Sequence, residues 1–158
     1  MKPVRTFTPR ASDIEARWRV VDASGKTLGR LATEISSALQ GKDTPLYARH
    51  INTGQYVVVI NAAEVKVTGK KQIQRFYYHH TGYHGGLKAI SLGDMLVKRP
   101  ERVIQHAVGG MLPGSKLGKS MLKRLKVYAK AEHPHQAQLS VSDNQKTKTA
   151  PQTTTGEA

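Results

Sequence analysis

The stretch VVDASGKTLGRLA, residues 20–32, decides the fold. A valine-rich segment at 18–22 has the composition of a strand and runs into a turn at Gly25. Beyond the turn, from Thr27 to Gln40, apolar residues recur along one face of a helix, at positions 28, 31, 32, 35, 38 and 39. Thr27 is suited to cap the start of this helix and Gly41 to end it. A strand that leads through a short glycine turn into a helix favours an α/β fold.

The tripeptide GKT at 25–27 is also the end of a phosphate-binding P-loop, G-x-x-x-x-G-K-[ST]. The first glycine of that motif would stand at position 20, which is Val20, in the middle of the expected strand. Gly25 and Gly29 do not complete the dinucleotide pattern G-x-G-x-x-G either. We therefore interpret Gly25 as a tight-turn residue and Gly29 as a residue that lets the helix pack closely on the sheet.

The start of a helix nevertheless attracts anions through its free N–H groups. One backbone phosphate of RNA would fit there, with Lys26 and Arg30 beside it.

The remaining pattern extends the α/β prediction. Residues 56–60, YVVVI, have the continuous apolar character of a strand buried on both faces. The next segment has two interpretations, a short helical turn that begins at Asn61 or a strand at 65–68. A β-type segment at 75–80 leads into a glycine-rich loop, TGYHGG. We then expect three short helices and a final strand, which start at Ser91, Pro100, Ser115 and Leu125.

Together these elements predict a three-layer α/β domain, with a mainly parallel central sheet flanked by helices on both sides. The expected boundaries are an irregular basic N-terminal arm at 1–16, the domain at 17–138 and a disordered C-terminal tail at 139–158. The tail is rich in Ser, Thr, Gln and Lys and has no periodicity.

The charge balance indicates a polyanionic partner. The 158 residues include 25 Lys and Arg but only 11 Asp and Glu, for a formal net charge of +14. No apolar run approaches the roughly 18 residues of a membrane span, and no signal-peptide segment follows Met1. Cysteine is absent, which excludes disulfides and cysteine-based zinc or iron–sulfur sites. A cytoplasmic nucleic-acid-binding protein is the expected class.

One group of cations lies on the third short helix. Lys116, Lys119 and Lys123 share one face of a helical wheel, opposite the leucines and Met121. A solvated helix face is the alternative interpretation, but no acid lies between the lysines, and like charges at this spacing repel. Neutralisation of the three lysines by phosphates explains the pattern better.

A second group combines cations with flat rings in residues 70–88. Lys and Arg can hold phosphates there, while Tyr and His stack on unpaired bases. The alternative is that the rings fill the core, and we expect this for Phe76 and for one of the adjacent tyrosines. We expect His79, His80 and Tyr83 to contact RNA.

Metal and catalytic sites are not expected. The histidine clusters at 79–84 and 133–135 have no nearby carboxylate to complete a ligand set, and neither H-E-x-x-H nor G-x-S-x-G occurs. A nucleotide-dependent enzyme on a Rossmann-like sheet would need the turn at 20–32 to hold a nucleotide, which Val20 opposes. A DNA-binding protein would need a groove-reading motif such as a helix-turn-helix, and none is recognisable.

Seven segments occur in one order across residues 16–138: WRVVDASGKTLGRLATEIS, NTGQYVVVINA, VTGKK, YYHHTGYHGGLK, RPERVIQHAVGGMLP, LGKSMLKRLKVYA and HPHQAQ. With these segments the chain resembles the bacterial large ribosomal subunit protein L13 family. The resemblance implies an α/β domain without catalytic activity that binds 23S rRNA early in assembly of the large subunit. It implies neighbouring ribosomal proteins as further partners, a place in cytoplasmic ribosomes, and no cofactor, membrane or small-molecule substrate. Lys130 stands where the family has a glycine, and a left-handed backbone there would cost a lysine about 1 kcal/mol.

The residue patterns and the match to the family's segments together give the expected RNA-binding residues. These are Lys26, Arg30, Lys70, Lys71, Arg75, His79, His80, Tyr83, Gly85, Gly86, Lys88, Arg99, Arg102, Lys116, Lys119, Lys123, Arg124, Lys126, His133 and His135.

Overall fold

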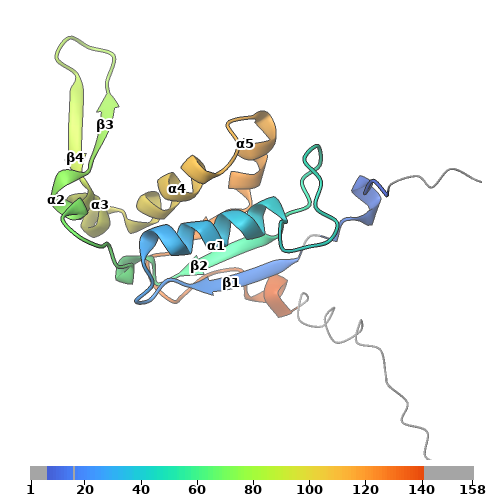
Figure 1. The fold of residues 1–158 in the computed structure, drawn as a ribbon. Helices are drawn as coiled ribbons and strands as arrows, with labels where there is room; N and C mark the ends of the chain where they lie inside the picture. The colour runs from blue at the N-terminus through green and yellow to red at the C-terminus, as the bar shows by residue number, and fades with distance from the viewer. Residues whose placement is uncertain (1–6, 16, 141–158) are drawn as a thin grey trace, which may run out of the picture.

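A computed structural model describes residues 7–15 and 17–140 of the chain (Figure 1). Residues 1–6 and 16 of the expected N-terminal arm, and residues 141–158 of the expected tail, lie outside the described residues. The elements in chain order are η1 (Ala11–Asp13), β1 (Trp18–Asp22), α1 (Leu28–Gln40), β2 (Tyr56–Ile60), η2 (Ala62–Glu64), α2 (Lys71–Gln74), β3 (Phe76–His80), β4 (Leu87–Ser91), α3 (Leu92–Lys98), α4 (Pro100–Met111), α5 (Lys116–Lys123) and β5 (Leu125–Val127).

The central sheet has three parallel strands in the order β1-β2-β5. The middle strand, β2, pairs with β1 from Trp18 opposite Tyr56 to Asp22 opposite Ile60. Its three valines, at 57–59, are completely buried. The expectation of a strand covered on both faces is therefore confirmed, and so is the mainly parallel sheet.

The core lies between this sheet and three helices on one of its faces, α1, α4 and α5 (Figure 1). Alternate strand residues point toward the helices, among them Val21, Val57 and Val59. On the opposite face Trp18 stacks on Tyr56, with ring centroids 4.6 Å apart, and His135 lies against Trp18. Rings thus cover much of the opposite face of this small sheet. Because α1, α4 and α5 all lie on one side, the expected three-layer arrangement with flanking helices on both faces is wrong for these elements.

The first helix matches its prediction closely. α1 begins directly after Thr27, whose side chain makes no capping hydrogen bond, and ends at Gln40. Gly41 follows with a left-handed φ of 76°, and its N–H donates to the carbonyl of Ala38. Gly25 has a φ of 68° and forms the tight turn as expected. Gly29, in contrast, does not pack on the sheet: it is exposed, and a Cβ added to it would meet no atom within 4 Å.

The segment after β2 forms the short helical turn η2 and not a strand. Asn61 begins it in a left-handed conformation (φ 56°), but its side chain donates to Asp22 and does not cap the turn. Lys66 forms only an isolated bridge to Thr27. No described non-glycine residue except Asn61 has a positive φ, so Lys130 avoids the strained turn.

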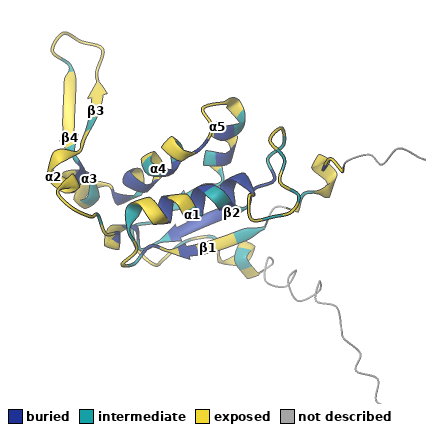
Figure 2. Ribbon diagram, in the orientation of Figure 1, coloured by how far each residue is buried: buried dark blue, intermediate teal, exposed yellow. Residues whose placement is uncertain are grey.

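The second sheet is an antiparallel hairpin of β3 and β4, with Phe76 opposite Ser91 and His80 opposite Leu87. The first of these strands was expected from the sequence. The second, Leu87–Ser91, was not, because the short LKAIS segment shows no strand pattern by itself and is a strand through its pairing with β3. The hairpin projects from the helices α2 and α3 at its base and is exposed over most of its length (Figures 1 and 2).

Candidate nucleic-acid interface

The antiparallel hairpin and the residues before it form a basic surface segment; we call residues 70–91 the basic hairpin. No acid occurs between residues 65 and 93. The segment brings together the expected residues Lys70, Lys71, Arg75, His79, His80, Tyr83, Gly85, Gly86 and Lys88. All of them except Gly86 are exposed.

Side chains along β3 alternate between the two faces of the hairpin. Phe76, Tyr78 and His80 alternate on one face, and Tyr77 and His79 on the other. Tyr78 is 67% exposed and Phe76 45% exposed, so the expectation that Phe76 fills the core is wrong. The expectation for one of the two tyrosines is confirmed.

Tyr77 is that tyrosine, and it anchors the hairpin. Its ring packs on a small core of Leu92, Met95 and Val103 and stacks on His106, with centroids 5.3 Å apart. The rest of the hairpin has no such support, which leaves its rings available for a partner.

The hairpin tip is a closed turn that displays one ring. The N–H of Thr81 donates to the carbonyl of Gly86, and the N–H of Gly86 donates to the carbonyl of Tyr83. Nδ1 of His80 accepts from the N–H of Gly82 at 3.0 Å. A Cβ on Gly86 would lie 2.7 Å from the carbonyl oxygen of Tyr83, a backbone atom of the same turn, so the turn itself favours that glycine. Tyr83 is 80% exposed at the tip and is therefore accessible for stacking.

The lysine face of α5 is presented as expected. Ser115 caps the helix by accepting from the N–H of Gly118 at 3.3 Å. Met121 is buried in the core, whereas Lys116, Lys119 and Lys123 are exposed on the other side. Arg99 and Arg102, at the start of α4, are also exposed.

Few of these cations are neutralised within the chain. Over residues 7–15 and 17–140 the ion pairs are Arg17–Glu15, Arg19–Glu34, Arg19–Asp43 and Lys26–Glu34. Lys26 is the one expected RNA-binding residue among them, 3.2 Å from Glu34. The pairs are solvent-exposed and each contributes at most about 1 kcal/mol. The cations of the basic hairpin and of α5 remain uncompensated by carboxylates in the described chain.

Lys26 and Arg30 are exposed at the start of α1, away from these surfaces, and four further expected residues lie between positions 124 and 135. Arg124 donates to the carbonyl of Gly54, and its guanidinium lies 5.1 Å from the ring centroid of Tyr56. His135 contacts the hydroxyl of Tyr128 at 2.9 Å, and its N–H donates to Nδ1 of His133. Lys126 is half-buried on β5. The structure gives Arg124 and the two histidines internal contacts that join chain segments.

Two further residues, the cation Lys66 and the imidazole-bearing His106, were not expected from the sequence. With Lys71 and Arg75 they line a cavity of about 270 Å³ between the start of α1, β3 and α4, which we call the basic cavity. Lys66 is held there by two backbone bonds, from its N–H to the carbonyl of Lys26 and from the N–H of Leu28 to its own carbonyl. For His106, the sequence signal was its position four residues after Arg102 on one helix face.

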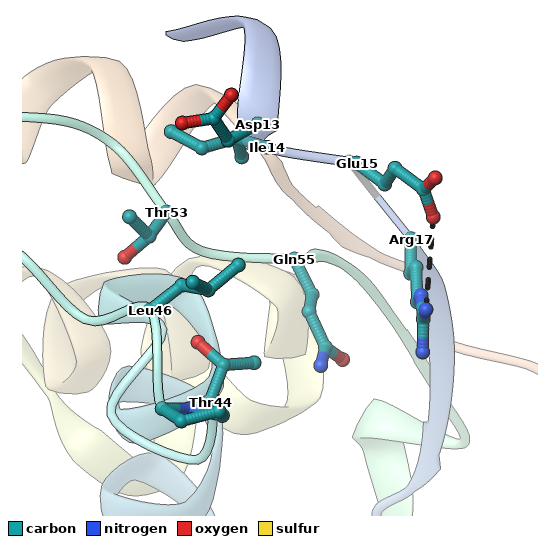
Figure 3. Close-up of a pocket in the computed structure, with 9 residues that line it drawn as sticks. Asp13, Ile14, Glu15, Arg17, Thr44, Leu46, Thr53 and Gln55 are labelled. Carbon is teal, nitrogen blue, oxygen red and sulfur yellow. Dashed lines mark ion pairs between the residues drawn. The ribbon is translucent and has the colours of Figure 1, made fainter. Parts of the chain in front are cut away.

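Another hollow, of about 340 Å³, lies between the segment at 13–17 and the loop at 44–55 (Figure 3). It is lined by Asp13 and Glu15, and its one cation, Arg17, pairs with Glu15 at 3.6 Å. This composition is unsuited to a phosphate. The described residues contain no group of three or more His, Asp or Glu that could hold a metal ion. Within the same part of the chain, no helix has the length and apolarity to cross a membrane.

Comparison with known proteins agrees with the resemblance. The family model of Ribosomal protein L13 matches residues 16–134. The large ribosomal subunit protein uL13 of Syntrophomonas wolfei is 50% identical over 135 residues, which cover 85% of this chain and 94% of the relative. The uL13 of Salinispora arenicola is 51% identical over 138 residues, 87% of this chain and 94% of the relative. The uL13 of Pseudomonas entomophila is 53% identical over 135 residues, 85% of this chain and 95% of the relative.

Proposed function

Because this chain belongs to the ribosomal protein L13 family, we propose that it binds 23S rRNA and stabilises its folded form in the large subunit. It is a structural protein of the large ribosomal subunit and not an enzyme. Its place is the cytoplasmic ribosome, where neighbouring large-subunit proteins are its other partners. The proposal includes entry early in 50S assembly and an arm and a tail that become ordered on RNA.

The observation that carries the proposal is the set of cations without carboxylate partners on the basic hairpin and α5. Lys and Arg that neutralise phosphates release condensed counterions, which drives binding to RNA. Exposed Tyr78 and Tyr83 supply flat rings for unpaired bases of a folded RNA. The proposed contacts are the twenty residues expected from the sequence, and the hairpin and α5 residues have the strongest structural support.

A comparison of nucleic acids tests the proposal directly. Binding of the full chain to a 23S rRNA transcript and to duplex DNA is measured at matched salt, from low to moderate ionic strength. We expect tighter binding to the rRNA, with log K falling by roughly 0.7 to 0.9 per neutralised phosphate for each unit of log salt. Equal binding to both, with equal slopes, would contradict recognition of folded rRNA.

Two single substitutions test whether RNA bases stack on the exposed tyrosines of the hairpin. Tyr78→Ala and Tyr83→Ala remove exposed rings without touching the core, and each should weaken rRNA binding by about 1–3 kcal/mol if a base stacks on that ring. Tyr47→Ala is the control, since Tyr47 is 39% exposed but lies in the loop after α1, outside the expected set. Equal affinities for all three variants would exclude stacking on the hairpin.

Early entry is tested by order of addition. An early-binding protein recognises the transcript before other proteins have shaped it. We expect the chain to bind protein-free 23S rRNA, and a requirement for other large-subunit proteins would contradict this part of the proposal.

A further inference from the structure

The basic cavity has a composition that the proposed phosphate contacts do not explain. Its cations, Lys66, Lys71 and Arg75, and the imidazole of His106 are joined by no carboxylate, and apolar side chains, including Leu28 and Met111, form much of the remaining lining. A phosphate alone would need only the cations, and a purely apolar ligand would need none of them. A ligand that carries both an anion and a flat, largely apolar body uses the whole lining.

Ring geometry supports a flat ligand. Tyr77 stacks on His106 with centroids 5.3 Å apart and planes 30° apart, and both residues line the cavity. The guanidinium of Arg75 lies 5.8 Å from the centroid of the same tyrosine ring. Rings and a guanidinium held in this way give a nucleobase surfaces on which to stack.

Two helical glycines keep the cavity open. Gly29 of α1 and Gly110 of α4 both line it, and a Cβ on either would meet no protein atom within 4 Å. Neither has a positive φ, so neither the backbone conformation nor packing within the chain demands glycine there. Space for a ligand gives a reason for both positions.

We propose that the basic cavity holds one unpaired nucleotide of the bound RNA. Its base lies against the apolar side chains and the rings, and its phosphate lies near Lys66, Lys71 and Arg75. A volume of about 270 Å³ suits a single nucleotide unit and is smaller than the roughly 300–1,000 Å³ of pockets for larger ligands. Arg75 and Tyr77 also belong to the basic hairpin, so the cavity continues the surface proposed for RNA. This inference rests on the proposed function.

The first test uses NMR of the full chain, with the amides of Gly29, Gly110 and Arg75 as reporters. The probes are adenosine monophosphate, ribose 5-phosphate, an RNA duplex with one bulged adenosine and the same duplex fully paired. We expect saturable shifts with adenosine monophosphate, weaker shifts with the sugar phosphate, and the tightest binding with the bulged duplex. The paired duplex should not shift Gly29 or Gly110.

The second test fills the cavity. Gly29→Leu and Gly110→Leu should weaken binding of adenosine monophosphate and of the bulged duplex by about tenfold, the factor that corresponds to about 1.4 kcal/mol of lost stacking. Gly114→Leu is the matched control, because Gly114 is equally open but lies outside the cavity. Thermal unfolding of each variant checks that the fold is intact.

The outcomes separate this inference from the proposed function. Gly110→Leu removes no cation, so the salt slope of 23S rRNA binding should stay at the value of the unmodified chain. Shifts with adenosine monophosphate but none with the bulged duplex would overturn the assignment to RNA in favour of a free nucleotide. No shift with either probe would overturn the site itself. Loss of rRNA binding in the unmodified chain would overturn the proposed function, while the adenosine monophosphate result would still report on the cavity.

Discussion

Asp22, at the carboxyl end of β1, joins the turn that follows it to the residue after β2. Its Oδ1 accepts from the N–H and the hydroxyl of Ser24, at 3.0 and 2.8 Å, and from the side-chain amide of Asn61, at 3.0 Å. These bonds, with the backbone bond from Ser24 as the largest cause and the charge of Lys26 adding to them, lower the pKa of Asp22 from its ordinary value of 3.8.

This shift predicts a pH dependence whose sign is fixed. A carboxyl with a depressed folded-state pKa stabilises the fold fully above its unfolded-state pKa, and this contribution is lost as the pH falls through the lower folded-state value. We expect the carboxyl carbon resonance of Asp22 to titrate with a midpoint below 3.8. Asn61→Gly keeps the left-handed backbone and removes one bond, so the midpoint should rise but stay below 3.8. A midpoint at or above 3.8 in the unmodified chain would refute the arrangement.

Gly54 gives a second prediction at the scale of one residue. A Cβ there would lie 1.8 Å from the carbonyl oxygen of Leu39, because the loop after α1 returns against the helix end. We expect Gly54→Ala to lower the free energy of unfolding by about 1–3 kcal/mol or more, the usual range for overpacking a tight site. Gly114→Ala, in open space, should change it by less than about 0.5 kcal/mol. Urea unfolding of both variants measures the difference, and equal stabilities would contradict the close approach.

At the scale of elements, α5 has two different faces: one packs on the core, and the other exposes three lysines. Met121 is buried, and Leu117 and Leu122 pack on the core, whereas the three lysines face solvent. A helix of eight residues is marginal by itself in water, so its apolar face must supply most of its stability. The lysine face can therefore be changed with little effect on the fold.

We expect the triple variant Lys116→Gln, Lys119→Gln and Lys123→Gln to weaken binding to 23S rRNA and to flatten its salt dependence. Each lost phosphate contact should reduce the slope of log K against log salt by roughly 0.7 to 0.9. Thermal unfolding should stay nearly unchanged. Lys42→Gln, which alters an exposed lysine outside the expected set, serves as the control. An unchanged slope in the triple variant would show that α5 does not contact phosphates.

At the scale of the whole molecule, the fold consists of a packed core and the basic hairpin, which projects from it (Figure 1). The three-stranded sheet and α1, α4 and α5 bury the main apolar cluster, and the basic hairpin extends beyond it on the small core around Leu92 (Figure 2). Under the proposed function, such a division would let the hairpin lie in a groove of folded RNA while the core keeps its own stability.

The corresponding prediction concerns the assembled particle. We expect the chain to co-sediment with the large ribosomal subunit and not with the small one. It should resist a high-salt wash better than a triple Lys→Gln variant of α5, because salt weakens each remaining phosphate contact while the shape-fitted contacts persist. Quantitative immunoblotting of gradient fractions measures both. Equal distribution over the two subunits would contradict a place in the large one.

The sequence by itself determined the elements whose signal is local. The strand at 18–22, the helix that ends at Gly41 and the strand at 56–60 follow from apolar periodicity and end residues within a few positions of each other. The excess of cations was likewise plain from composition. Local patterns succeed here because one face of each element is buried in the same core.

Only the tertiary structure decided what depends on residues far apart in the chain. Leu87–Ser91 becomes a strand by pairing with β3, and the segment at 65–68 is not a strand because only an isolated bridge to Thr27 pairs with it. Lys66 and His106 reach one cavity because a turn after β2 and the middle of α4 meet beside the start of α1. Such encounters are set by how the packed elements fold back on each other, and no periodicity within a single segment encodes them.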